Sequence, residues 1–177
     1  MRSSKAEPSI WVFRGLYLFA FVLVFWPLVD LVTNTLPMHP GDVRWRYGFA
    51  GLLAGFLHTP ILGLALATFL AYSRSSGFTL RALAALELLG ALVLLLIMGV
   101  FVLDVVQVRA MRPPDSMPAF LTGAAISEAK HFTAFLVLVA LGIGSWKTGA
   151  LVREVSTARG AAEAPRGIVA ASGGARS

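Results

Sequence analysis

Two histidines and a glutamate stand inside apolar stretches of this 177-residue chain, where titratable side chains are uncommon. A charged group at the centre of a bilayer costs at least about 2.5–3.5 kcal/mol on insertion scales, so each such residue needs a partner or a role. His58 lies in one apolar stretch. Glu128 and His131 lie three residues apart in another, and therefore share a helical face. This spacing predicts that the three side chains meet inside a helical bundle.

Three kinds of chemistry would explain the two histidines. Imidazoles on two helices at similar depth can ligate haem b axially, which makes His58 and His131 candidate cofactor ligands. The same rings could instead relay protons. In the structural interpretation, each ring forms an interhelical hydrogen bond, and Pro60 frees the carbonyl of Phe56 as an acceptor. The structural interpretation is favoured, because two histidines without a family spacing are a weak haem signal.

Further acidic side chains lie at membrane depth. Glu87 stands about two turns inside its apolar stretch, where an ion pair with Arg14 is expected. Asp104 lies near the other end of the same stretch and is expected to be a wet interfacial carboxylate. Glu128 is expected to pair with Lys130 at the interface, although an outward-facing hydrophilic pocket is the alternative. A transport pathway would use the set Glu87, Asp104, Glu128 and His131.

Sequence signatures of catalysis are missing. The chain has no cysteine, which excludes disulfides, thiolate metal sites and cysteine nucleophiles. It contains no glycine-rich phosphate loop, no HExxH and no Ser/His/Asp arrangement. We therefore expect no catalytic residue, no metal site and no enzymatic activity.

The elements that carry these residues are four long apolar runs, at about 10–31, 45–72, 80–106 and 120–151. Hydrophobic residues make up 57% of the chain and charged residues 14%, against about 45–50% and 25% in soluble domains. A helix needs about 20 apolar residues to cross the hydrocarbon core. The sequence therefore predicts an all-α integral membrane protein, folded as a four-helix transmembrane bundle.

Charge distribution predicts the topology. The whole net charge of +6 falls on the side that holds both termini and the second loop. Lys and Arg accumulate on cytoplasmic loops, so we expect an N-in/C-in protein of a cytoplasmic-type (inner) membrane. The same distribution favours contact with anionic lipid over nucleic-acid binding. Residues 1–9 are expected to be a short cytoplasmic lead, 10–153 the transmembrane domain and 154–177 a disordered tail.

The second run carries a stripe of small residues with a spacing of four, namely Gly51, Gly55, Thr59, Gly63 and Ala67. Small residues at this spacing let transmembrane helices approach closely. The expected partner is the fourth run or a second copy of the chain.

Three functions are compatible with these features. The leading hypothesis is a non-catalytic accessory or structural subunit, with the lipid bilayer and other membrane subunits, or a second copy of itself, as its partners. The alternatives are a haem b redox protein that uses His58 and His131, and an oligomeric transporter of a small solute or protons.

Overall fold

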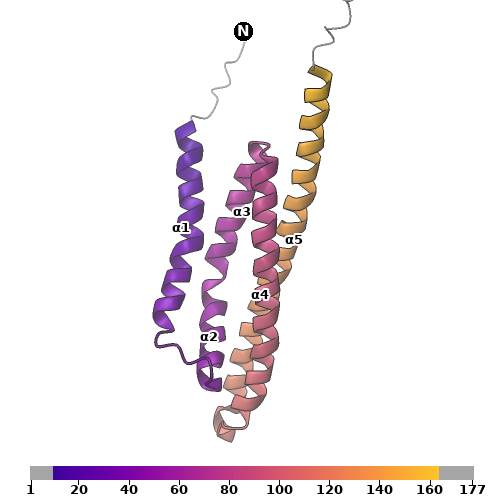
Figure 1. The fold of residues 1–177 in the computed structure, drawn as a ribbon. Coiled ribbons are helices and arrows are strands. Elements are labelled where there is room, and N and C mark those ends of the chain that lie inside the picture. The colour runs from indigo at the N-terminus through magenta and orange to yellow at the C-terminus, as the bar shows by residue number, and fades with distance from the viewer. Residues whose placement is uncertain (1–9, 164–177) are drawn as a thin grey trace, which may run out of the picture.

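The computed structural model describes residues 10–163, and these residues form helices joined by short turns, with no strand among them. The helices are α1 (Ile10–Asn34), α2 (Val43–Phe56), α3 (His58–Ser73), α4 (Gly77–Arg109) and α5 (Met117–Glu163), with a 3-10 turn η1 (Pro114–Ser116) before α5 (Figure 1). The all-helical prediction is confirmed for this part of the chain.

Three stretches of the described chain are each long and apolar enough to cross a membrane, and a bent pair would form a fourth span. The single spans are α1, α4 and the stretch Pro114–Val155, which includes most of α5. The bent pair is α2 and α3, whose axes differ by 45°. The four predicted apolar runs therefore correspond to three continuous helices and one broken one.

The break between α2 and α3 falls at Leu57, three residues before Pro60. Proline has no N–H, and its ring collides with the carbonyl four residues earlier, which here belongs to Phe56. Helical hydrogen bonding continues on both sides: Leu57 N donates to Leu53 O at 3.1 Å, and Ile61 N donates to Leu57 O at 3.2 Å. The chain therefore bends without losing the turn at Leu57.

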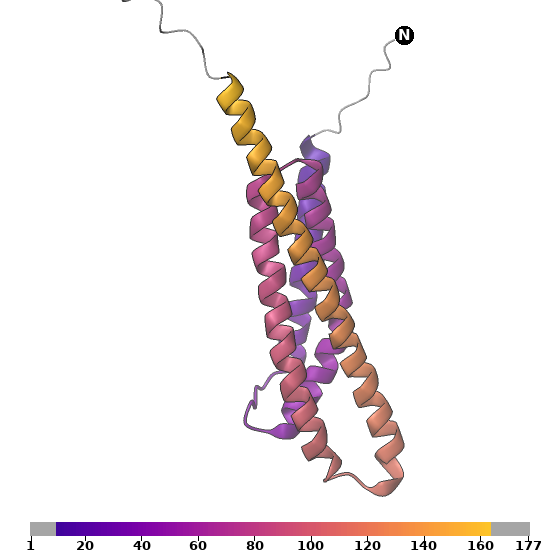
Figure 2. The same ribbon diagram turned by 90° about the vertical axis from the view of Figure 1, so that its right-hand side faces the viewer.

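The helices pack as two main pairs. α4 and α5 share the most extensive contact, and α1 packs chiefly against α3, while α2 and α3 both touch α4. α5 crosses the other helices obliquely, and its last turns extend beyond their ends (Figure 2). The start of α1, the α3–α4 turn and the end of α5 all lie at one end of the molecule (Figure 1).

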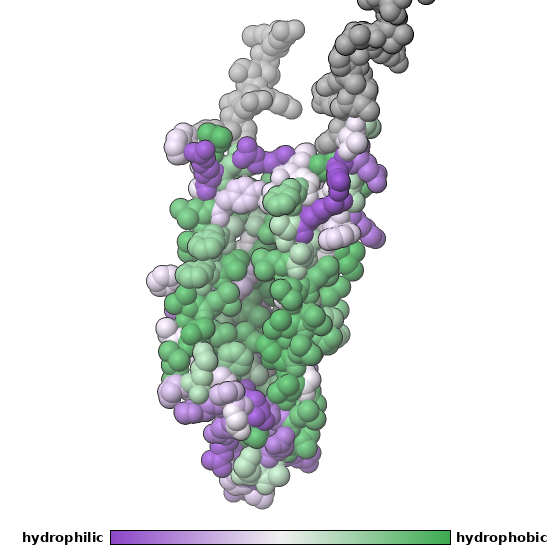
Figure 3. Space-filling view, in the orientation of Figure 1, coloured by the Kyte–Doolittle hydropathy of each residue, from purple (hydrophilic) through white to green (hydrophobic). Residues whose placement is uncertain are grey.

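The core between the pairs is apolar and the outer surface is apolar as well. One buried cluster consists of Leu31, Leu53, Ala91, Leu94, Ala134 and Leu138. Outside it, large apolar side chains such as Leu96 and Phe69 remain exposed. They form a belt between two polar ends (Figure 3). A soluble monomer rarely exposes so large an apolar surface, whereas a bilayer covers it. The chain is thus suited to be an integral membrane protein.

Most predicted boundaries shift by up to three residues, as at the end of α1, which is Asn34 rather than Leu31. The end of α5 shifts most, because the helix continues to Glu163 rather than ending near Leu151. Residues 154–163 are therefore helical, and the prediction of a disordered tail is wrong for them. The rest of that predicted tail, and the predicted lead at 1–9, lie outside the described residues.

Candidate functional site

Glu87 is the most deeply buried acidic residue of the membrane core, with no exposed surface. Thr68 Oγ1 donates to one carboxyl oxygen at 2.7 Å, and Ser145 Oγ donates to the other at 3.1 Å. The three residues come from α3, α4 and α5, so the carboxyl group joins three helices. The expected pair with Arg14 is wrong: its guanidinium lies 5.1 Å from the ring centre of Trp11 instead.

A lateral groove of about 490 Å³ runs between α3 and α5 next to this hydrogen-bonded group. Thr68 and Ser145 line the groove, and both also bind Glu87. Most other lining side chains are small or apolar, including Ala65, Ala140 and Gly144. The groove therefore combines two hydroxyl groups with an apolar surface that bilayer components can reach from the side.

The α5 wall of this groove carries Ala140, Gly144 and Thr148 at intervals of four residues. This is the small-residue spacing that allows transmembrane helices to approach closely. Gly144 is exposed, and a methyl group added there would meet no atom within 4 Å. No described part of the chain therefore packs against the wall at Gly144.

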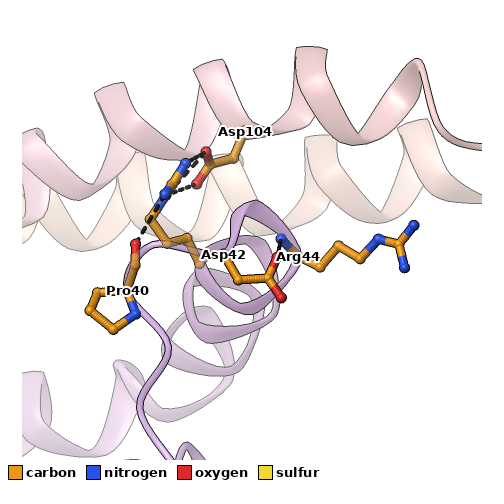
Figure 4. A network of polar contacts seen from close by, with 5 residues as sticks. Pro40, Asp42, Arg44 and Asp104 are labelled. Atoms are coloured by element: carbon orange, nitrogen blue, oxygen red, sulfur yellow. Dashed lines mark hydrogen bonds and ion pairs between the residues drawn. The ribbon is translucent and has the colours of Figure 1, made fainter.

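A second buried carboxylate, Asp104, lies near the opposite end of α4 and is only 1% exposed. Arg46 Nη2 and Nε donate to its two oxygens at 2.7 and 3.1 Å (Figure 4). Such bidentate pairing is the strongest geometry available to an arginine and a carboxylate. The prediction of a wet interfacial carboxylate is therefore wrong for Asp104, which is buried and paired.

The same arginine also fastens the loop between α1 and α2. Arg46 Nη1 donates to the carbonyl of Pro40 at 3.0 Å, and the Asp42 side chain accepts from the backbone N–H of Arg44 at 2.8 Å (Figure 4). Asp42 thereby caps the N-terminus of α2, where unpaired N–H groups need acceptors. These contacts close one end of the molecule, and their role is structural.

His131 is fully buried in α5, with its ring edge-on to Phe101 at a centroid distance of 5.7 Å. Its Nδ1 lies 4.0 Å from Glu128 Oε2, one helical turn away on the same face, and this distance is the limit of an ion pair. The ring faces the backbone of Ala50 without a well-aligned hydrogen bond, and within residues 10–163 neither ring nitrogen has a partner of good geometry.

His58 is not part of this group. It begins α3 just after the break and is exposed. No hydrogen bond, ion pair or ring contact joins it to His131 in the described part of the chain. The structure therefore brings Glu128 and His131 together but leaves His58 apart, and this geometry does not support axial ligation of haem by the two histidines.

The predicted small-residue stripe divides at the bend. A methyl group added at Gly63 would lie 2.8 Å from the carbonyl oxygen of Ala20, so this glycine allows α1 and α3 to touch. Gly51 and Gly55 have nothing within 4 Å of the added atom, and Thr59 and Ala67 are half-buried. The expected pairing of this stripe with the fourth run is wrong at Gly63, which packs against α1.

The sequence indicated the acidic residues at membrane depth but did not indicate their hydrogen-bond partners. Thr68, Ser145 and Arg46 satisfy Glu87 and Asp104, yet none of the three was singled out as a partner. A usable signal existed for Arg46, because it lies just inside the start of one apolar run while Asp104 lies just inside the end of the next. No comparable signal marks Thr68, because hydroxyl groups are common in membrane helices.

Within the described ranges, no group of three or more His, Asp or Glu side chains is placed to hold a metal ion. The chain matches no protein-family model, and comparisons with curated proteins and with solved structures likewise found no match.

Proposed function

We propose that this chain is a non-catalytic subunit of a membrane complex, and that the groove between α3 and α5 receives a transmembrane helix of its partner. The groove carries this proposal, because it is a lateral opening of about 490 Å³ with a small-residue wall next to a well-satisfied polar centre. Helix association in lipid depends on close packing of this kind rather than on the hydrophobic effect.

The polar groups of the core support a structural role. Glu87 and Asp104 are both used in contacts between helices of this chain. Catalysis requires a nucleophile, acid or base that is open to substrate, and these two carboxyl groups are enclosed. The hydrogen bonds of Glu87 to Thr68 and Ser145 hold the two walls of the groove in fixed positions, which reduces the ordering cost of receiving a partner.

Orientation follows from the charges at the end that holds the α3–α4 turn. Three arginines lie there: Arg14 in the first turns of α1, Arg74 at the end of α3 and Arg81 near the start of α4. Lys147 and Arg153 lie in the second half of α5. Basic residues favour the cytoplasmic face. The proposed topology is therefore N-in and C-in, in a cytoplasmic-type (inner) membrane, with a closed bundle completed by the partner helix.

Site-specific photocrosslinking in native membranes tests this function. A photoreactive residue at Leu141, in the groove, should give an adduct with another membrane protein, whereas one at Leu92, on the exposed face of α4, should not. Gly144→Leu should abolish the adduct by filling the groove, and its Cβ has open space because no atom lies within 4 Å of that position. Gly99→Leu is the matched control, because Gly99 also has open space around it.

Each result decides the proposal. An adduct with a second protein that Gly144→Leu removes and Gly99→Leu keeps is the expected outcome. An adduct of doubled chain mass would assign the groove to self-association instead. Adducts with lipid alone, in membranes that contain all native partners, would overturn the subunit role.

A further inference from the structure

Two glycines bring α4 and α5 together at the end of the molecule that holds the α3–α4 turn. A methyl group added at Gly149 would lie 3.1 Å from the carbonyl oxygen of Gly77 and 3.1 Å from Cγ of Arg81. The aliphatic part of Arg81 therefore lies directly over the backbone of α5. This contact fixes where the guanidinium group can reach.

The guanidinium group of Arg81 lies 5.9 Å from the ring centre of Trp146, within reach of a cation–π contact. Its Nε is buried and has no hydrogen-bond partner among the residues that the structure describes. A buried donor left without an acceptor costs free energy. The guanidinium group of Arg81 is therefore held in place by its contacts with α5, and its Nε–H remains available to an acceptor.

Two hollows adjoin this arginine, and Arg153 lines both of them. One has a volume of about 380 Å³ and includes Ser75 and Phe78 in its wall. The other has a volume of about 570 Å³ and includes Glu154 and Thr157. Two arginines and one carboxylate therefore surround the hollows, and the excess charge is positive.

The surroundings identify the kind of anion. The smaller hollow is lined by the α3–α4 turn and the start of α4, at one of the two polar ends that border the apolar belt (Figure 3). Phe78, in the wall of the smaller hollow, is 86% exposed and lies at the start of α4. A ligand that fits would carry a negative head beside the arginines and apolar chains along the belt, which is the chemistry of an anionic phospholipid.

We propose that Arg81 and Arg153 bind the headgroup phosphate of an anionic phospholipid in the leaflet next to the α3–α4 turn. Guanidinium groups bind phosphate through parallel, charge-assisted hydrogen bonds, and a phosphate oxygen would satisfy Nε of Arg81. Ser75 provides a hydroxyl donor at the edge of the smaller hollow. This site is separate from the α3–α5 groove and does not depend on the proposed function.

Lipid titration of the full chain tests the site. The purified protein in micelles of an uncharged maltoside detergent, which carries no phosphate, is titrated with phosphatidylglycerol, and bound lipid is counted by native mass spectrometry. The site variant is Arg81→Gln/Arg153→Gln. The control variant is Arg14→Gln/Lys147→Gln, which removes the same charge at the same end, from residues outside both hollows.

The control variant loses only long-range attraction, which is about five-fold per charge at an anionic surface. The site variant also loses charge-assisted hydrogen bonds, so its affinity should fall at least about ten-fold further. Arg81→Lys keeps the charge and loses the planar fork, and several-fold weaker binding is expected. This conservative variant also covers the case in which the double variant fails to fold.

Three results would overturn the proposal. Equal losses in the site and control variants would mean diffuse attraction without a site. Unchanged affinity in Arg81→Lys would mean that guanidinium geometry has no part in binding. Displacement of phosphatidylglycerol by inorganic phosphate at equal concentration would mean a site for free anions, because the acyl chains would contribute nothing.

Discussion

Two glycine-to-alanine substitutions on the same bent span should have opposite effects on stability. At Gly63 the new methyl group would lie 2.8 Å from Ala20 O, 2.8 Å from Val24 Cγ2 and 3.0 Å from Leu23 Cβ. At Gly51 it would meet no atom within 4 Å. The chemical change is identical, so the difference between the two variants measures the contact between α1 and α3.

The magnitude follows from two opposing terms. Alanine stabilises a helix by about 1 kcal/mol relative to glycine, so Gly51→Ala should gain about 0.5–1 kcal/mol. Overpacking costs about 1–3 kcal/mol, and the upper part of that range applies at Gly63 because a backbone carbonyl on α1 must move. After the propensity gain, Gly63→Ala should lose about 2 kcal/mol, which leaves the two variants about 3 kcal/mol apart.

Unfolding in mixed detergent and dodecyl sulfate micelles, followed by helical circular dichroism, measures both changes. The free energy of unfolding is compared at equal slope, so that a change in the denatured state is not mistaken for a change in stability. Gly55→Ala is a second control, because its surroundings are also open. Equal stability of Gly63→Ala and Gly51→Ala would refute the close contact between α1 and α3.

Three more predictions rest on the buried acids. Arg46→Met should destabilise the protein more than the double variant Arg46→Met/Asp104→Leu in the same unfolding assay, because the single change leaves a buried carboxylate without its partner. Glu87→Gln should cost under about 1 kcal/mol and Glu87→Leu about 1–3 kcal/mol, since only the amide keeps acceptors and donors for the two hydroxyl groups. In liposomes carrying a pH-sensitive dye, the rate of proton leak with the purified chain should equal the rate in vesicles without protein. A leak that Glu87→Gln abolishes would contradict that expectation.

The membrane-spanning helices were predictable because a bilayer allows few backbone conformations. Backbone groups in lipid must be satisfied within the chain, so long apolar runs become helices. Pro60 also indicated where a helix would be disturbed. Its consequence for His58 was missed, because the run at 45–72 was predicted as one span in which His58 would meet Glu128 and His131. A 45° bend at Leu57 turns α3 away from α2, and His58 becomes exposed.

Helix neighbours were not predictable from hydropathy. Glu87 and Arg14 lie at similar distances from the same end, which made an ion pair reasonable. In the structure α1 packs mainly against α3, so Arg14 stacks on Trp11 and Glu87 binds hydroxyl groups of α3 and α5. Apolar periodicity gives the depth of a residue along a helix, whereas neighbour identity depends on side-chain shape at many contacts.

The buried face of α4 keeps the two buried carboxylates apart with apolar residues. It carries Glu87 near one end and Asp104 near the other, with Ala91, Leu94 and Phe101 between them. Glu87 and Phe101 are fourteen residues apart, or about 21 Å at the helical rise. Over that length the buried positions of α4 are all apolar, and a proton would find no titratable group on this face. The polar groups therefore fix helices at separate depths, while the α3–α5 groove and the Arg81 site open to the bilayer from the side.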